Sequence, residues 1–140
     1  MTTCARRALG WLAGLLAAAA LVTAAPAFDS QRLQRAAERL GPRAVAAVAP
    51  LEQMLAQAGP LDEEGQLAAV NGFFNRRIVF REDAQAWGQV DHWASPLEAL
   101  DKGFGDCEDY AIAKYFSLVA LGVPVQRLRL VYVRAQVGAD

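Results

Sequence analysis

The residues best suited to chemistry occupy four consecutive positions, Asp106, Cys107, Glu108 and Asp109. Aspartate is a common cap at the start of a helix, so a helix should begin at Cys107 with Asp106 as its N-cap. A helix N-terminus offers unpaired N–H groups and a positive dipole end, which lower a thiol pKa and favour the nucleophilic thiolate. The same N–H groups could hold the oxyanion of acyl transfer. Cys107 is therefore a candidate catalytic nucleophile.

The three carboxylates beside Cys107 oppose this chemistry, because like charges raise the pKa of a thiol and disfavour its thiolate. A hard divalent cation would resolve the conflict. Carboxylate oxygens are ligands that Ca²⁺ prefers, and the ion would cancel their charge. We therefore predict a Ca²⁺ site formed by Asp106, Glu108 and Asp109. The alternative is that these acids only complement the helix dipole.

Other metal sites and a local catalytic base fit the sequence less well. An EF-hand loop counted from Asp101 would have Asp106 in place of its glycine and Ile112 in place of its glutamate. A Zn²⁺ site would have only Cys107 and the single histidine, His92, as soft ligands. A cysteine nucleophile needs a base. His92, 15 residues before Cys107 in a predicted loop, is better suited to a structural or surface role.

The N-terminus has the pattern of a cleavable export signal. Arg6 and Arg7 precede an apolar run over residues 8–22, and the small residues ending at Ala27 fit a cleavage site. The run is shorter than the roughly twenty residues that a spanning helix needs. We therefore expect cleavage before Phe28 rather than an uncleaved anchor, and no stable membrane insertion afterwards.

Cleavage would divide the chain into a signal peptide, residues 1–27, and one domain, residues 28–140, which is long enough for a single modest core. The only charged residues of the signal are two arginines, so the formal net charge would change from −1 to −3. Without clustered lysine and arginine, nucleic-acid binding is excluded. Cys4 would be removed, and Cys107 would be the one mature cysteine, either buried and inert or reactive.

The elements before the site are predicted to be mainly helical, from the spacing of apolar residues and from Gly-Pro boundaries. The predicted helices cover residues 29–40, a second stretch to Ala58 that is interrupted at Pro50, and a third from Asp62. A short strand over residues 78–80 and a structured loop over residues 81–94 follow. We expect the loop tryptophans, Trp87 and Trp93, to pack in the core.

Capping signals set the elements around the site. Ser95-Pro96-Leu97-Glu98 is a capping box with proline at the first helical position, which predicts a short helix ending before Gly103. The helix from Cys107 should run to Leu121 and, being apolar nearly all round, should lie in the middle of the domain. Alternating apolar residues over 127–133 predict a strand.

Several motifs occur in order between residues 66 and 134. They are Val70-Asn71-Gly72-Phe73-Phe74-Asn75, Trp87-Gly88, Asp91-His92-Trp93-Ala94-Ser95-Pro96-Leu97-Glu98, Gly105-Asp106-Cys107-Glu108-Asp109-Tyr110-Ala111-Ile112-Ala113-Lys114-Tyr115-Phe116, Leu121-Gly122-Val123-Pro124 and Leu128-Arg129-Leu130. With these motifs the chain resembles the bacterial transglutaminase-like cysteine proteinases of the LapG type.

The resemblance implies an α+β, papain-like or transglutaminase-like fold, in which the nucleophile begins a central helix packed on an antiparallel sheet. It matches Cys107 to the family nucleophile, and Asp106, Glu108 and Asp109 to the family's calcium-binding acids. The family's catalytic histidine and aspartate follow the strand at Leu128. We therefore expect an incomplete fold whose sheet is truncated after its first strand, and no turnover by the 140-residue chain alone.

The resemblance also implies a function. Members are calcium-dependent periplasmic endopeptidases that release large biofilm adhesins by cutting near the adhesin N-terminus, and an inner-membrane receptor for cyclic di-GMP restrains them. Because a fold does not fix a function, two alternatives stay open. One is acyl transfer to an amine, and the other is a non-catalytic module that binds calcium or the receptor.

Overall fold

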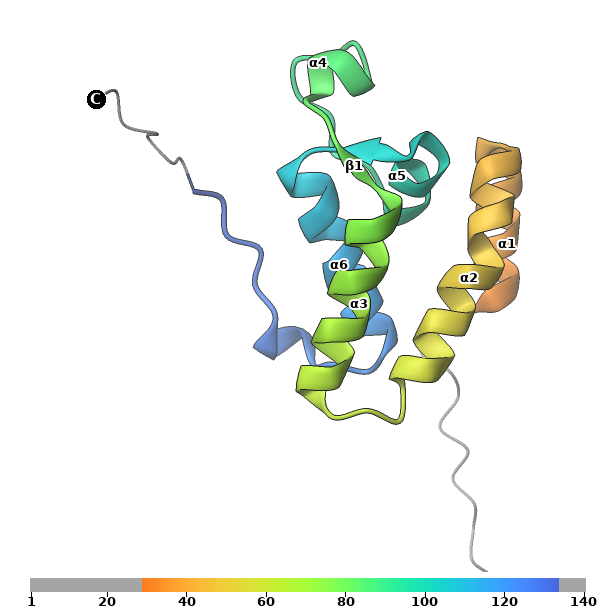
Figure 1. Ribbon diagram of the computed structural model, residues 1–140, viewed down its shortest axis with the longest axis vertical. Coiled ribbons are helices and arrows are strands. Elements are labelled where there is room, and N and C mark those ends of the chain that lie inside the picture. The colour runs from red at the N-terminus through yellow and green to blue at the C-terminus, as the bar shows by residue number, and fades with distance from the viewer. Residues whose placement is uncertain (1–28, 134–140) are drawn as a thin grey trace, which may run out of the picture.

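The computed structural model describes residues 29–133, so the predicted signal peptide lies outside the described residues. Six α-helices, two short strands and one 3₁₀ helix follow one another in this part (Figure 1). They are α1 (Ser30–Leu40), α2 (Pro42–Ala58), α3 (Glu63–Arg77), β1 (Val79–Phe80), α4 (Asp83–Ala86), α5 (Pro96–Lys102), β2 (Phe104–Gly105), α6 (Cys107–Ala120) and η1 (Val125–Arg127). None of these helices is long and apolar enough to cross a membrane.

The three predicted N-terminal helices are confirmed, with one correction. Asp29 caps α1 by accepting a hydrogen bond from the Arg32 N–H, and Asp62 caps α3 in the same way. The interruption predicted at Pro50 is wrong, because α2 runs through it. A proline removes one helical N–H, but the buried side chain of Leu51 and its neighbours in α2 hold the helix against the core.

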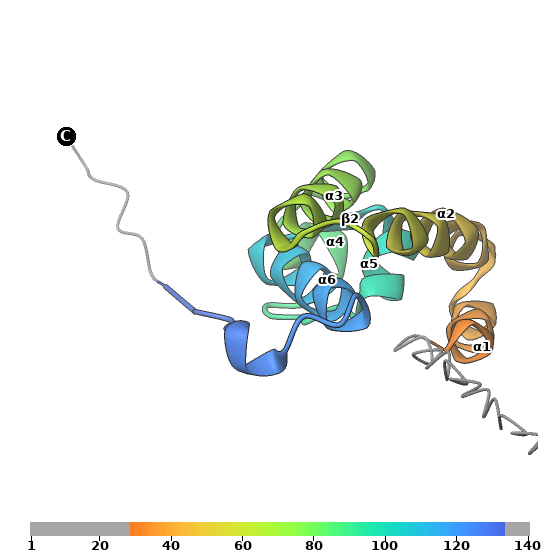
Figure 2. The same ribbon diagram turned by 90° about the horizontal axis from the view of Figure 1, so that it is seen from below.

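The main core lies where α2, α3, α5 and α6 meet, and Figure 2 shows α3 and α6 lying side by side. Phe74 of α3 is fully buried in this core. Removing such a side chain from water stabilises a fold by about 1.5–3 kcal/mol. On α6, Ala113 and Leu118 face the core but Phe116 is 55% exposed. Within the described residues, α6 is therefore covered on one face rather than on all sides as predicted.

Of the two loop tryptophans predicted to lie in the core, one does and one does not. Trp87 is partly buried and packs against the main core. Trp93 is 60% exposed, so its predicted core position is wrong. The cause is local: the Trp93 indole N–H donates a 3.0 Å hydrogen bond to the exposed Asp91, which holds the ring at the surface.

The strand predicted over residues 78–80 forms as β1, but the sheet differs from the predicted antiparallel one. β1 pairs with β2 in parallel, with Val79 opposite Phe104 and Phe80 opposite Gly105. A crossover containing α4 and α5 joins the two strands, which is the type of connection that parallel strands require. Because β2 ends directly before Asp106, this pairing fixes where α6 begins.

The prediction of a strand over residues 127–133 is also wrong. The structure has η1 at the start of this segment and irregular backbone from Leu128 to Val133. A strand needs a neighbour to accept and donate its backbone hydrogen bonds, and no described strand lies beside this segment. The segment therefore has the alternating sequence of a strand but, within the described residues, no backbone pairing with another strand.

Candidate active site and metal centre

The start of α6 is built as predicted, with Asp106 as N-cap and Cys107 as the first helical residue. The Asp106 N–H donates a 3.4 Å hydrogen bond to Oδ2 of Asp109. The preceding Gly105 is tightly enclosed, because a Cβ at this position would lie 2.8 Å from both Cβ and Oδ2 of Asp109. A glycine is therefore needed for β2 to pass so close to the first turn of α6.

Asp109 is a fully buried carboxylate that joins two parts of the site. Its Oδ1 accepts a 2.7 Å hydrogen bond from the N–H of Ala94, at the end of the loop before α5. Burial raises the pKa of Asp109, while the hydrogen bonds from the backbone N–H groups of Ala94 and Asp106 lower it. Both oxygens thus hold backbone groups in place, which gives this acid a structural role besides any role in binding metal.

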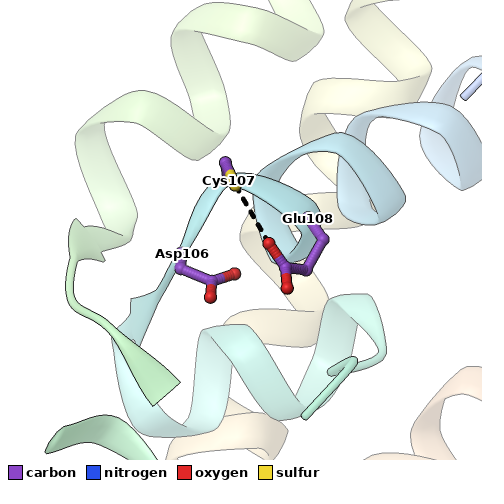
Figure 3. Close-up of side chains that lie close together, drawn as sticks. All are labelled: Asp106, Cys107 and Glu108. Atoms are coloured by element: carbon purple, nitrogen blue, oxygen red, sulfur yellow. Dashed lines mark hydrogen bonds between the residues drawn. The ribbon is translucent and has the colours of Figure 1, made fainter. Parts of the chain in front are cut away.

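The Cys107 thiol is exposed and donates a 3.0 Å hydrogen bond to Oε2 of Glu108 (Figure 3). This hydrogen bond raises the pKa of Cys107, and burial and the negative charges of Glu108 and Asp106 raise it further. The same bond lowers the pKa of Glu108. Without a cation, the acids therefore favour the thiol over the thiolate, which is the opposition that the sequence predicted.

Cys107 forms part of the wall of two clefts. One, of about 230 Å³, is mainly apolar and is lined by Trp93, Ala111 and the segment 130–133. The other, of about 690 Å³, is bordered by several carboxylates, among them Asp83, Asp91, Asp106 and Glu108. The sulfur is thus reachable from solvent and lies between an apolar surface and an acidic one.

The carboxylates gather in a different combination from the predicted one. Three groups of side chains each place one candidate ligand atom per residue within 4.8 Å of the others. These groups are Asp106 with Cys107 and Glu108, Asp83 with Asp106 and Asp109, and Asp83 with Asp91 and Glu108. Each of the predicted ligands Asp106, Glu108 and Asp109 is thus in at least one group, but no group contains all three.

The acidic groups fit a hard cation. Oδ1 of Asp83 and Oδ1 of Asp106 are buried and have no hydrogen-bond partner among the described residues. Burial, together with Glu108, Asp83 and Asp109, raises the pKa of Asp106 to about 7. No described lysine or arginine forms an ion pair with these acids. Uncompensated carboxylate oxygens are the donor set that Ca²⁺ takes, so the residues present fit this ion.

Sequence reasoning did not identify Asp83 and Asp91 as members of these groups. They precede Asp106 by 23 and 15 residues, and no local spacing rule connects them to it. The available signal was weak: acids in a segment, residues 81–94, that also carries two tryptophans. Their approach to α6 depends on the path of the crossover between β1 and β2.

His92 lies in the same crossover, stacked on Trp87 with ring centroids 4.0 Å apart. Its backbone N–H donates to Oδ2 of Asp83, and its Nε2 is buried with no hydrogen-bond partner in the described part of the chain. The thiol of Cys107 has Glu108 rather than His92 as its hydrogen-bond partner. This arrangement agrees with a structural role for His92.

The family model described as bacterial transglutaminase-like cysteine proteinase BTLCP matches residues 51–140, which include all the acids and the thiol of the site. The chain belongs to this family. It is thus related to cysteine proteinases, as its motifs indicated. A search of curated protein sequences gave no significant match.

Solved structures of LapG from Legionella pneumophila also match this family member. The calcium-bound form is 32% identical, with a TM-score of 0.59, and the alignment covers 71% of this chain and 55% of that one. The EGTA-treated form is 33% identical, with coverages of 74% and 55% and the same TM-score. A further LapG structure is 34% identical, with coverages of 74% and 56% and again a TM-score of 0.59.

The match supports a transglutaminase-like fold over part of the chain. The chain spans about half the length of the LapG structures it matches. One of those LapG structures is calcium-bound. The acidic groups around Cys107 are the part of this chain that could bind a metal.

Proposed function

We propose that this protein is a calcium-dependent cysteine endopeptidase of the periplasm, with Cys107 as its nucleophile. The observation that supports this most is the exposed Cys107 thiol at the first residue of α6, in the wall of two clefts. Family membership supports peptide-bond hydrolysis as the reaction. By the same resemblance the substrate is a large surface adhesin, and the regulator is an inner-membrane receptor for cyclic di-GMP.

The proposed chemistry follows from the position of the sulfur. The Cys107 thiolate attacks the peptide carbonyl, and unpaired N–H groups in the first turn of α6 stabilise the oxyanion. In the metal-free chain the hydrogen bond to Glu108 holds the proton on sulfur. Ca²⁺ bound to Asp106 and Glu108, with Asp109 nearby, would supply positive charge that favours the thiolate.

The proposed reaction also requires a base, which we assign to a histidine outside these 140 residues. The 140-residue sequence contains one histidine, His92, and its ring packs against Trp87. The family resemblance puts the catalytic histidine and aspartate after the Leu128 segment. We therefore expect the 140-residue chain to show no turnover by itself.

The decisive experiment uses the nucleotide sequence that follows codon 140, read in all three frames, to extend the protein. The extended protein should cleave an N-terminal fragment of a large adhesin, and EGTA or Cys107→Ser should abolish cleavage. Asp29→Asn, a change in the cap of α1, is the matched control and should leave cleavage intact. An extension without a histidine and an aspartate, or cleavage that survives Cys107→Ser, would contradict the proposal.

A second candidate is a non-catalytic calcium-binding module, which the raised pKa of the Cys107 thiol favours. The two functions differ in how the thiol responds to calcium. A protease should react faster with iodoacetamide once Ca²⁺ is bound, because the acids no longer oppose the thiolate. A module should bind Ca²⁺ without any gain in the rate of thiol labelling.

A further inference from the structure

We propose that Asp83 is a further ligand of the cation bound at the start of α6, so that the cation joins the crossover between β1 and β2 to the helix that carries Cys107. This inference rests on the proposed function, which supplies the identity of the cation as Ca²⁺. It assigns a metal-binding role to a residue outside the Asp-Cys-Glu-Asp motif.

The first argument is that the Asp83 side chain is buried and only partly hydrogen-bonded. Asp83 is the first residue of α4 and is only 4% exposed. Its Oδ2 accepts a hydrogen bond from the N–H of His92, whereas its Oδ1 is buried and has no partner among the described residues. A buried carboxylate oxygen without a partner costs free energy unless a cation or a donor compensates it. Asp83 thus has one oxygen committed to the fold and one free for a ligand.

The second argument is where that carboxylate lies. One oxygen each of Asp83, Asp106 and Asp109 lie within 4.8 Å of one another, and all three side chains are buried. Oxygens that bind one Ca²⁺ at about 2.3–2.6 Å can be separated by at most about twice that distance. The observed spread meets this limit. Asp106, which belongs to the same group, also has an unpartnered buried oxygen, Oδ1.

The third argument is charge. Asp83 also belongs to the group with Asp91 and Glu108, so it connects the buried acids to the acids that border the larger cleft. No described lysine or arginine forms an ion pair with any of them. Several carboxylates so close together repel one another, and a divalent cation is the simplest partner that compensates them within the described structure.

A cation held in this way would act on the surroundings of Cys107. Asp83 holds the backbone of His92, and the next residue, Trp93, lines both clefts beside the sulfur. Binding of Ca²⁺ between Asp83 and Asp106 would therefore restrict the movement of His92 and Trp93 beside the sulfur. Without the cation, the hydrogen bond from the Ala94 N–H to Asp109 would still join this segment to α6.

The test is calorimetric titration with Ca²⁺ of the protein without its predicted signal peptide. Asp83→Asn should weaken binding about tenfold or more, because it removes a charged ligand. Asparagine can still accept the hydrogen bond from His92, so the thermal unfolding temperature in EGTA should not fall. The matched control is Glu82→Gln, which removes the same charge from the adjacent exposed residue, a member of none of the three groups. It should change affinity by less than about threefold.

Equal weakening by Glu82→Gln would show that only net charge matters, and it would overturn the proposal. Unchanged affinity in Asp83→Asn would do the same. Hydrogen exchange of the wild type gives a test without a variant: Ca²⁺ should slow exchange of the amides of residues 84–92, and an unchanged rate would contradict the proposal. If Asp106→Asn abolishes binding while Asp83→Asn leaves the affinity unchanged, this inference fails but the calcium dependence of the proposed function stands.

Discussion

The carboxylate of Asp109 accepts a 2.7 Å hydrogen bond from the backbone N–H of Ala94, which joins the first turn of α6 to the end of the loop before α5. Both residues are completely buried. Asp109 therefore stabilises the site even without a metal, because it satisfies a buried backbone donor that no water can reach.

Asp109→Ala should lower the free energy of unfolding by about 1–3 kcal/mol in EGTA, because it leaves the Ala94 N–H buried without an acceptor. Urea denaturation followed by circular dichroism would measure the loss. Asp91→Ala removes an exposed aspartate from the same loop and should change stability by no more than about 0.5 kcal/mol. Equal losses in the two variants would contradict the structural role of Asp109.

Gly105→Ala should also destabilise the protein, by about 1–3 kcal/mol, since its Cβ would be forced against Asp109. The control is Gly59→Ala, where the new Cβ would make an ordinary 3.4 Å contact with the carbonyl oxygen of Leu55. Gly59 has φ −51 and ψ −43, which alanine adopts readily, so that variant should be neutral or slightly stabilised. Thermal unfolding of the two variants side by side would distinguish these outcomes.

The thiol of Cys107 should be slow to alkylate in EGTA. Because its pKa is raised, the thiolate fraction at neutral pH is smaller than in an unstructured cysteine peptide, and the midpoint of iodoacetamide labelling against pH should lie higher. Glu108→Ala removes both the hydrogen-bond acceptor and its charge, so it should shift the midpoint down and speed labelling several-fold. Glu38→Ala, at an exposed position of α1, should leave this midpoint unchanged. A midpoint below that of the free peptide would contradict the described hydrogen bond.

The stability of the metal-free protein should fall as pH rises from 5 to 8, and Asp106 should account for part of this fall. Its pKa is raised from 3.8 to about 7 in the folded state. The stabilising contribution is therefore fully present below pH 3.8 and is lost as pH rises through about 7, with a slope of at most about 1.4 kcal/mol per pH unit.

Asp106→Asn should flatten this dependence, because asparagine does not titrate. The measurement is the thermal unfolding temperature of both proteins in EGTA at a series of pH values. Asp91→Asn, at an exposed position, should retain the slope of the wild type. A wild type whose stability increases over the same range relative to Asp106→Asn would have the opposite sign and would refute the raised pKa.

The sequence determined the local features of this protein. The caps at Ser95 and Asp106 were both predicted, because a cap depends on contacts between residues a few positions apart. The same holds for the position of Cys107 at the start of a helix beside acids that oppose its ionisation. The motifs around it were also sufficient to indicate the family, which the family match then showed.

Only the tertiary structure decided which distant groups meet. It brought Asp83 and Asp91 to Asp106 and Glu108, paired β1 with β2 in parallel, and left the alternating segment 128–133 without a neighbouring strand. The physical reason is that helical periodicity and capping are short-range, whereas a metal-binding group or a strand ladder needs residues that the chain must first bring together. Asp109 had both kinds of role, and the sequence revealed only the local one, because its partner Ala94 lies 15 residues away.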